Sequence, residues 1–334
     1  MDSLTHIALG VALGEVTGRR QIGKSALVLG AMAQSFPDID FFAFLWTSIT
    51  GDLLAHRGFT HSIAFILLTA PLFALIARRY RPGIEFSFLR WVTFFGLQMA
   101  VHDFIDAFNA YGTGWFEPFS QARISFHTLF VVDPLFMLGL LFACLMIFFL
   151  KVEDSRRKRL VWMGIVWSVL YLGYAVSNKM TVDYAVRQDL DSKKISYQRL
   201  LTTPTPLNTW LWWVVAEQPD GFQVGYRSRF DSKSETDFKF VPRNDSLLLN
   251  LKNQDVSNLK EFSQGFYTIE QRGDTLVFND LRFGQLGWDD PSVPFVFSYY
   301  LNLPEQNQLV MQRGRFARWN KSKAKAFLNR IGGN

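Results

Sequence analysis

The sequence has almost no cysteine: Cys144 is the single one among 334 residues. A disulfide framework and a cysteine-ligated zinc site are therefore excluded. Charge is also scarce, at 19% of residues, against about 25% in an ordinary soluble domain. Aromatic residues, in contrast, are abundant, with 33 Phe, 10 Trp and 10 Tyr. A chain with so much apolar surface is not a disordered protein.

Charged residues are distributed unevenly along the chain. They account for 27 of the first 180 residues and 37 of the remaining 154. This change predicts two domains, a helical membrane domain over residues 1–180 and a β-rich domain outside the membrane over residues 181–334. Much of the net charge of +6 lies in the acid-free tail from Arg313 to Arg330, so we expect no nucleic acid as a partner.

Apolar segments dominate the first domain. Three approach the ~20 residues that cross a bilayer core, and the others are shorter. The fold class predicted is thus an α-helical membrane bundle, with about four to six helices spanning or partly inserted, followed by a β-rich soluble domain. The segments are Ser3–Thr17, Ile22–Phe36, Ser62–Ala77, Leu89–Phe108, Leu129–Leu150 and Leu160–Ser177.

Basic residues occur at every second turn between these segments, near Arg19, Arg78–Arg81 and Lys151–Arg159. Short basic loops stay on the cytoplasmic side of a membrane. The chain is therefore expected in the bacterial inner membrane, with both ends and the β-rich domain extracytoplasmic. The first residues include Asp2 and His6 rather than a basic region, so no cleavable signal peptide is expected.

Short alternating segments bounded by turn residues follow residue 180. Residues 210–216 and 222–228 flank Gln218-Pro219-Asp220-Gly221 and predict a hairpin. Residues 266–270, 275–283 and 295–302 predict further strands, and a basic helix is expected near residues 315–330. This half contains no recognisable catalytic set.

All five histidines lie within the first 127 residues, and the predicted topology brings them to the outer membrane face. Asp38, Asp40, Asp103 and Asp106 are expected at the same face. Polar groups within a membrane domain are costly unless they pair or bind an ion. The histidines are His6, His56, His61, His102 and His127.

Two motifs follow the second apolar segment. In Pro37-Asp38-Ile39-Asp40, proline ends the helix, and two carboxylates at i and i+2 of an extended segment face the same side. The pair favours a cation, although a helix cap in a solvated turn is the alternative. In the stretch from His56 to Ser62, a glycine-containing loop can turn both imidazoles toward one ion. Arg57 there suits a phosphate or a carboxylate, and a neutral surface loop is the alternative.

Helical spacing supports two further candidates. His102 and Asp106, at i and i+4, share a face of the fourth segment, either as ligands or as a hydrogen-bonded pair. His6 shares a face with Gly10 and Gly14 and should point into the bundle, as a ligand or as a packing residue.

The remaining candidates are weaker. His127 opens the fifth segment and is a possible ligand or acid, and Asp133-Pro134 is equally compatible with a kink that caps backbone groups. Glu117 is the acid in the outer loop and a candidate general base. The donors are nitrogen and oxygen without thiolate, which suits one to three divalent ions, zinc first and manganese or iron as alternatives.

Together these motifs resemble the bacterial membrane-bound metal-dependent hydrolases of the YdjM type. The resemblance rests on Asp2-x-x-Thr5-His6, Pro37-Asp38-Ile39-Asp40, the His56–Ser62 stretch, His102-x-x-x-Asp106 and Tyr111-Gly112. A further segment, from Thr203 to Trp212, is similar to the opening of the carboxy-terminal domain in longer members. The family is thought distantly similar to zinc-dependent phospholipase C and P1-type nucleases, which implies phosphodiester or phospholipid substrates.

The sequence thus predicts a membrane-bound hydrolase that acts through a metal-activated water. Arg57 is expected to hold an anionic substrate, and a lipid head group fits because it lies at this depth in the bilayer. A non-enzymatic membrane protein, with a structural metal or a transport-related polar cluster, is the alternative. The expected core ligands are His56, His61, His102 and Asp106, completed or bridged by His6, Asp38 and Asp40.

Overall fold

The computed structural model describes residues 1–151, 153–232, 236–249, 251, 253–287, 293–303, 307 and 320–333. They form two compact units. One consists of Met1–Ala43 and Ala55–Ala175, and the other of Phe44–Leu54 and Val176–Asn334. The short segment Phe44–Leu54 therefore belongs to the second unit, although it lies in the sequence between two candidate ligand motifs.

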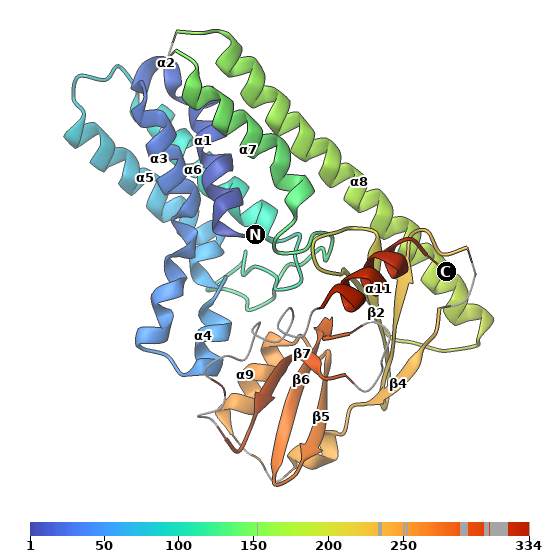
Figure 1. Cartoon of the computed structure of the whole chain (residues 1–334). Helices are drawn as coiled ribbons and strands as arrows, with labels where there is room; N and C mark the ends of the chain where they lie inside the picture. The colour runs from blue at the N-terminus through green and yellow to red at the C-terminus, as the bar shows by residue number, and fades with distance from the viewer. Residues whose placement is uncertain are drawn as a thin grey trace. The chain divides into compact units, whose positions relative to one another are not determined.

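The first unit is helical (Figure 1). Each of the six apolar segments predicted from the sequence overlaps a helix, so the expectation of a helical amino-terminal region is confirmed. The helices are α1 (Ser3–Thr17), α2 (Arg19–Ile22), α3 (Ser25–Ser35), α5 (Ile63–Tyr80), α6 (Phe88–Asp106), α7 (Pro134–Phe149) and α8 (Arg156–Ser192), which continues into the second unit.

Side-chain caps explain where several helices begin. Asp2 accepts a hydrogen bond from the backbone N–H of Thr5, and Ser62 accepts one from that of Phe65. Such caps satisfy amides that have no partner within the helix. Asp133 accepts from two backbone amides with Pro134 as the first helical residue. Asp133-Pro134 therefore begins α7 and does not kink a longer helix.

Helices α1 and α3 touch backbone to backbone. A Cβ atom added at Gly14 would lie 2.3 Å from the carbonyl oxygen of Ala26, and one added at Gly30 would lie 2.3 Å from that of Gly10. Only glycine fits at such a contact. The predicted small-residue face of α1 is thus the face that contacts α3.

Replacing Gly14 by alanine is expected to destabilise the protein, because the added methyl group forces the two helices apart. Overpacking of this kind costs about 1–3 kcal/mol. Thermal unfolding of detergent-purified protein, followed by circular dichroism, measures the effect. Gly173→Ala in α8 is the matched control, since its added Cβ meets no atom within 4 Å, and it should unfold no earlier than the parent. Equal melting temperatures for both variants would contradict the close contact.

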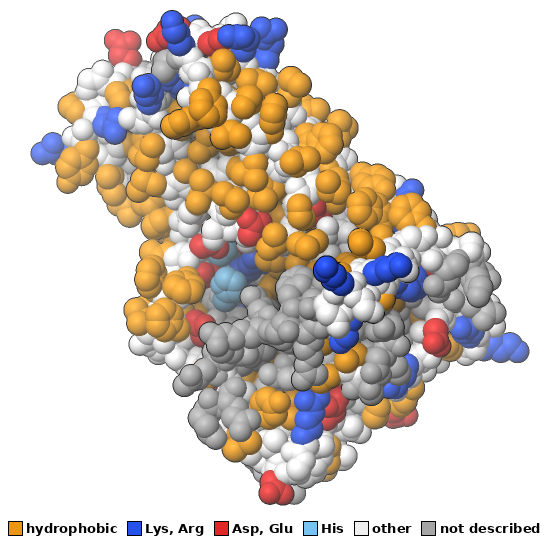
Figure 2. Space-filling view, in the orientation of Figure 1, with side chains coloured by type: hydrophobic (Ala, Val, Ile, Leu, Met, Phe, Trp, Pro, Cys, Tyr) orange, Lys and Arg blue, Asp and Glu red, His pale blue; other side chains and the backbone are white. Residues whose placement is uncertain are grey.

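Two helices among the described residues, α5 and α8, are long and apolar enough to cross a membrane, and α1, α3 and α7 are shorter apolar helices. Helix α5 exposes Leu67, Leu68 and Leu72. Figure 2 shows hydrophobic side chains over much of the visible face of the helical unit, with basic side chains gathered at one end. The coarse prediction of apolar helices followed by a β-rich region holds, and the number of helices that span stays a prediction.

The second unit contains two antiparallel sheets formed by its described strands. One has the order β1-β2-β3-β4 and the other the order β5-β6-β7. The strands are β1 (Leu200–Pro204), β2 (Leu211–Gln218), β3 (Gly221–Ser228), β4 (Lys239–Pro242), β5 (Tyr267–Arg272), β6 (Thr275–Gln285) and β7 (Phe295–Tyr300).

The predicted hairpin is confirmed as β2 and β3, with Gln218 paired to Gly221 at the turn. The other predicted strands correspond to β5, β6 and β7. The short strands β1 and β4 and helix α9 (Gln254–Phe262) were missed by the sequence analysis. The basic helix is α11 (Lys321–Ile331), and residues 315–319 of its predicted range lie outside the described residues.

Helix α4 (Ile49–Ala55) lies largely within the segment Phe44–Leu54, and hydrogen bonds connect it to α9. The hydroxyl of Thr50 donates to Asp255 at 2.5 Å, and the side-chain amide of Asn258 donates to Thr50 at 3.0 Å. Thr50 is completely buried. These bonds account for the grouping of residues 44–54 with the second unit.

Candidate metal centre

Candidate ligands meet at one end of the helices of the first unit. His6 lies near the start of α1, and His102 and Asp106 lie near the end of α6. Asp38 lies in the 3-10 helix η1 (Pro37–Leu45) that follows α3, and His61 ends the 3-10 helix η2 (Phe59–His61) that precedes α5. The ends of four helices therefore supply the polar groups.

Four side chains form a compact donor set. One donor atom each from Asp38, His61, His102 and Asp106 lies within 4.8 Å of the other three. Nε2 of His61 is 3.0 Å from Nε2 of His102. Oδ1 of Asp38 lies 3.7 and 3.6 Å from these nitrogens, and Oδ2 of Asp106 lies 3.7 and 3.8 Å from them.

These separations suit a tetrahedral ion. Bonds of about 2.0–2.1 Å to nitrogen and oxygen place the donor atoms of a tetrahedron about 3.3 Å apart. Five of the six donor separations, from 3.0 to 3.8 Å, surround that length, and the donor atoms of Asp38 and Asp106 lie within 4.8 Å of each other. The cluster could therefore hold a metal ion.

Both imidazoles are oriented through their other ring nitrogen. Nδ1 of His102 lies 2.6 Å from the carbonyl oxygen of Gln34, and Nδ1 of His61 lies 3.3 Å from Oδ2 of Asp40 and 3.1 Å from the hydroxyl of Thr60. A proton on Nδ1 leaves Nε2 as the electron-pair donor. Partners of this kind are typical of histidine ligands.

Asp38 and Asp40 have different roles because the segment is not extended, as the sequence analysis predicted, but a 3-10 helix. At 3.0 residues per turn, side chains at i and i+2 point in different directions. Asp38 therefore faces Nε2 of His61, and Asp40 faces its Nδ1. This arrangement places Asp40 behind a ligand rather than in the four-residue donor set.

Asp106 connects the donor set to its surroundings. Its Oδ1 contacts the backbone nitrogen of Met1 and lies 3.1 Å from Nε2 of His6. Its buried Oδ2 faces Nε of Arg57 at 3.0 Å without hydrogen-bond alignment. A buried carboxylate oxygen in this position is suited to a cation.

The acidic side chains of η1 have lowered pKa values. Burial raises the pKa of Asp38, but the contact with His61 and the charge of His102 outweigh it and lower the pKa to about 2. Burial also raises the pKa of Asp40, yet contacts with His56 and His61 hold that pKa well below its usual range. Burial lowers the pKa of His61, and Asp38 and Asp40 more than offset this, so its pKa is raised. The site therefore concentrates negative charge around His61.

Arg57 is the cation beside the donor set. Its guanidinium carbon lies 5.0 Å from the ring centre of Tyr111, its backbone N–H donates to Asp40 at 2.5 Å, and its backbone has the unusual φ of 58°. The side chain is buried, and its Nη1 makes no hydrogen bond. An unpaired donor at this depth is suited to an anion.

The other predicted residues lie at or outside the edge of this set. Nδ1 of His56 is 3.4 Å from Oδ1 of Asp40, and the ring of His6 stacks on that of His102 with 3.8 Å between centroids. Glu117 packs against Gly114 in the loop after α6, and His127 also lies outside the four-residue set.

Sequence reasoning did not identify three contributors, the Gln34 carbonyl, Thr60 and Tyr111. Asp103 was expected at this face, and its two buried carboxylate oxygens make no hydrogen bond. Thr60 and Tyr111 were noted only as members of sequence motifs. A backbone carbonyl carries no signal in the sequence.

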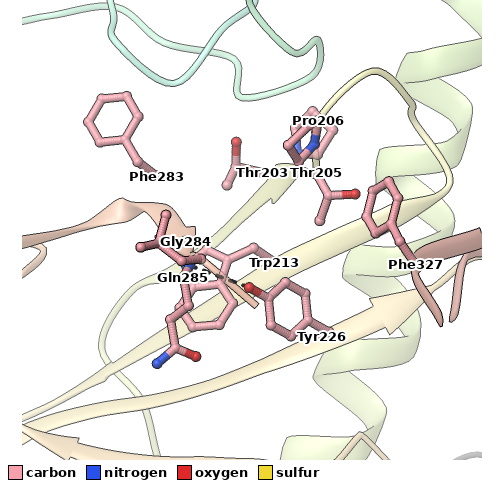
Figure 3. A pocket seen from close by; sticks show the side chains of 11 residues that line it. Thr203, Thr205, Pro206, Trp213, Tyr226, Phe283, Gly284, Gln285 and Phe327 are labelled. Atoms are coloured by element: carbon pink, nitrogen blue, oxygen red, sulfur yellow. Dashed lines mark hydrogen bonds between the residues drawn. The ribbon is translucent and has the colours of Figure 1, made fainter. Parts of the chain in front are cut away.

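A pocket in the second unit has no comparable chemistry. Figure 3 shows Trp213, Phe283 and Phe327 around it, with Thr203 and Thr205 from β1 and the segment after it. Among its described lining residues there is no acid, histidine or cysteine, and the hydroxyl of Tyr226 donates to the carbonyl of Gly287 at 3.1 Å. It offers no catalytic set.

Comparisons with known proteins agree with the motif resemblance. The profile of a family described as YdjM inner membrane protein matches residues 1–182. The uncharacterized protein YfhP of Bacillus subtilis (strain 168) is 33% identical over 141 residues, which cover 40% of this chain and 42% of YfhP. The inner membrane protein YbcI of Escherichia coli (strain K12) is 30% identical over 123 residues, which cover 36% of this chain and 69% of YbcI. No solved structure matches the chain.

Proposed function

The chain belongs to the YdjM inner membrane protein family, and from this premise we propose that it is an integral membrane hydrolase that depends on a divalent metal ion. The substrate class proposed is a phosphodiester or phospholipid. Zinc is the proposed ion, with manganese or iron as alternatives, because the donors are two imidazoles and two carboxylates.

The observation that carries the proposal is the donor set next to a cation that keeps a hydrogen-bond donor unused. Asp38, His61, His102 and Asp106 place donor atoms within 4.8 Å of one another. The buried Nη1 of Arg57 makes no hydrogen bond, while its Nε pairs with Oδ2 of Asp106 at 3.0 Å. Asp38 is the partly exposed member, at 29% of its side-chain surface, while the other three are completely buried. Solvent and substrate would therefore reach the centre from the side of Asp38.

Each residue has a role in this proposal. A divalent ion held by these residues with one coordination position open to solvent would acidify a water molecule there and stabilise charge that develops on a phosphoryl oxygen. Arg57 would hold a second substrate oxygen, and its stacking on Tyr111 keeps the guanidinium in place. Asp40 and the Gln34 carbonyl would hold the two imidazoles in the ligating orientation.

Arg57→Lys tests the anion site. Lysine keeps the positive charge beside Asp106 but lacks the fork of donors. A charge-assisted hydrogen bond contributes about 1.5–3 kcal/mol, so we expect kcat/KM for bis(p-nitrophenyl) phosphate to fall about 10- to 100-fold with metal content unchanged.

The control for this test is Arg156→Lys, since Arg156 is exposed and pairs with Asp154 beyond the end of α7. It should hydrolyse the diester at the parent rate, and a chelator should stop hydrolysis in both proteins. Unchanged kcat/KM in Arg57→Lys would contradict the anion site. Bound metal without any hydrolysis would indicate a structural ion instead.

We further propose that the metal centre faces the extracytoplasmic side. The basic residues after α1, at the end of α5 and at the start of α8 lie at the helix ends opposite to the donor set, and basic loops favour the cytoplasm. A carboxy-terminal alkaline phosphatase fusion should be active, and a green fluorescent protein fusion should be dark. The reverse pattern would contradict this orientation.

A further inference from the structure

A continuous apolar surface begins directly after the acidic residues of η1. We name the exposed apolar residues of η1 that belong to the first unit, Ile39, Phe41 and Phe42, the aromatic segment. Their side chains are exposed at 42%, 68% and 52%. No charged residue occurs from Phe41 to Gly51. Contiguous exposure of this kind indicates an interaction surface rather than the scattered apolar residues of a soluble protein.

Length and composition indicate what covers this surface. Helix η1 has nine residues, and at about 2.0 Å per residue it is ~18 Å long, too short for a hydrocarbon core of about 30 Å. An element that is apolar, aromatic and too short to span is suited to the interfacial layer of a bilayer, where Trp and Phe are enriched.

The start of the segment is continuous with a candidate membrane helix. Phe36, just before η1, stacks on Phe65 of α5 with 5.8 Å between ring centres and meets Phe73 edge-on at 4.6 Å. Phe59, at the start of η2, packs on the same Phe65. Helix α5 exposes apolar side chains along its length and is long and apolar enough to cross a membrane. The lipid that contacts α5 would therefore continue onto Ile39, Phe41 and Phe42.

We propose that the aromatic segment inserts into the lipid interface and that the substrate of the metal centre is a membrane phospholipid. This substrate assignment rests on the proposed hydrolase function. Phe41 follows Asp40 and lies three residues after the candidate ligand Asp38, which at about 2.0 Å per residue is ~6 Å along η1. The polar donors are therefore directly adjacent to the apolar surface. A phospholipid has the matching arrangement, with its phosphate toward the ion and Arg57 and its acyl chains along the aromatic segment.

Site-directed spin labelling tests the insertion. Since Cys144 is the single cysteine, a Cys144→Ala chain accepts one nitroxide at a chosen position. Labels replace Phe42, Leu68 on α5 as the lipid reference, and Asp220 in the β2–β3 turn as the water reference. The protein is reconstituted into vesicles of phosphatidylglycerol and phosphatidylethanolamine, and collisions with oxygen and with a water-soluble nickel chelate are measured.

The expected result is that the ratio of oxygen to nickel collisions at Phe42 resembles that at Leu68 and exceeds that at Asp220 at least fivefold. A ratio equal to that at Asp220 would overturn the proposal. Low access to both reagents would show that protein covers the segment and would overturn it as well.

The substrate class is tested separately with the double variant Phe41→Ser and Phe42→Ser. We expect hydrolysis of phosphatidylglycerol in vesicles to fall at least tenfold, with hydrolysis of bis(p-nitrophenyl) phosphate and metal content unchanged. Phe119→Ser, which removes another exposed aromatic residue, is the matched control and should retain both activities. Unchanged lipid hydrolysis, or equal loss of both activities, would overturn the lipid assignment. If the parent hydrolyses neither compound, the hydrolase proposal fails, while the spin-label result still decides insertion.

Discussion

Replacing His61 by alanine is expected to remove the metal ion from the purified protein. His61 lies at the centre of the site: its Nε2 faces Asp38, His102 and Asp106, and its Nδ1 faces Asp40. Zinc sites with four ligands bind with about 10–16 kcal/mol in total, so one ligand accounts for roughly 3 kcal/mol. The affinity should therefore fall at least ~100-fold, measured by elemental analysis of detergent-purified protein and by competition with a chelator.

His127→Asn is the control for this prediction. It also removes an imidazole, but His127 lies outside the four-residue set, and asparagine tolerates the backbone φ of 47° found there. The control should retain the metal content of the parent. Equal metal content in His61→Ala and the parent, with both proteins folded by circular dichroism, would refute the centre. Metal loss in both variants would point to a different ligand set.

Asp106→Ala is expected to weaken metal binding and also to lower the thermal stability of the metal-free protein. The carboxylate contacts Met1, His6 and Arg57 besides the two imidazoles of the donor set. Without it, the buried guanidinium of Arg57 loses its ion pair. Removal of one partner of a buried pair costs about 3–5 kcal/mol. Thermal unfolding in detergent in the presence of a chelator should show this loss independently of any ion.

Asp38→Asn separates the two effects. Asp38 lies at nearly the same distances from the imidazoles as Asp106, but it is partly exposed and pairs with the two histidines of the donor set. This variant should lose affinity for the metal while its metal-free form unfolds at nearly the temperature of the parent. We distinguish Asp38, a partly exposed ligand, from Asp106, a ligand that also stabilises the helical unit. Equal destabilisation of the metal-free protein by both variants would contradict this distinction.

The spacing of residues within single elements was the reliable part of the prediction. His102 and Asp106 share a face of α6 because side chains at i and i+4 coincide in any α-helix. The hairpin of β2 and β3 followed from its turn residues. The strands that were missed, β1 and β4, have five and four residues. Segments this short contain too few alternations for a pattern to emerge.

Where the prediction depended on local backbone geometry, it was wrong. Asp38 and Asp40 were expected on one side of an extended segment, but in a 3-10 helix they contact the two different nitrogens of His61. Apolar residues at positions 39, 41 and 42 of the sequence suit a helix as well as a strand. Phe36, directly before the segment, packs on Phe65 of α5, and a tertiary contact of this kind is not visible in the local sequence pattern.

The sequence by itself determined which chemistry is available: nitrogen and oxygen donors without thiolate, gathered in a helical apolar region that ends near residue 180, before the β-rich part begins. These properties depend on residue type and on short-range periodicity. Only the tertiary structure decided which four side chains form the donor set and which nitrogen of each histidine faces it. Asp38, His61, His102 and Asp106 come from three elements separated by tens of residues. Their positions to within an ångström depend on how α1, α3, α5 and α6 pack, and that packing is not encoded in any local pattern.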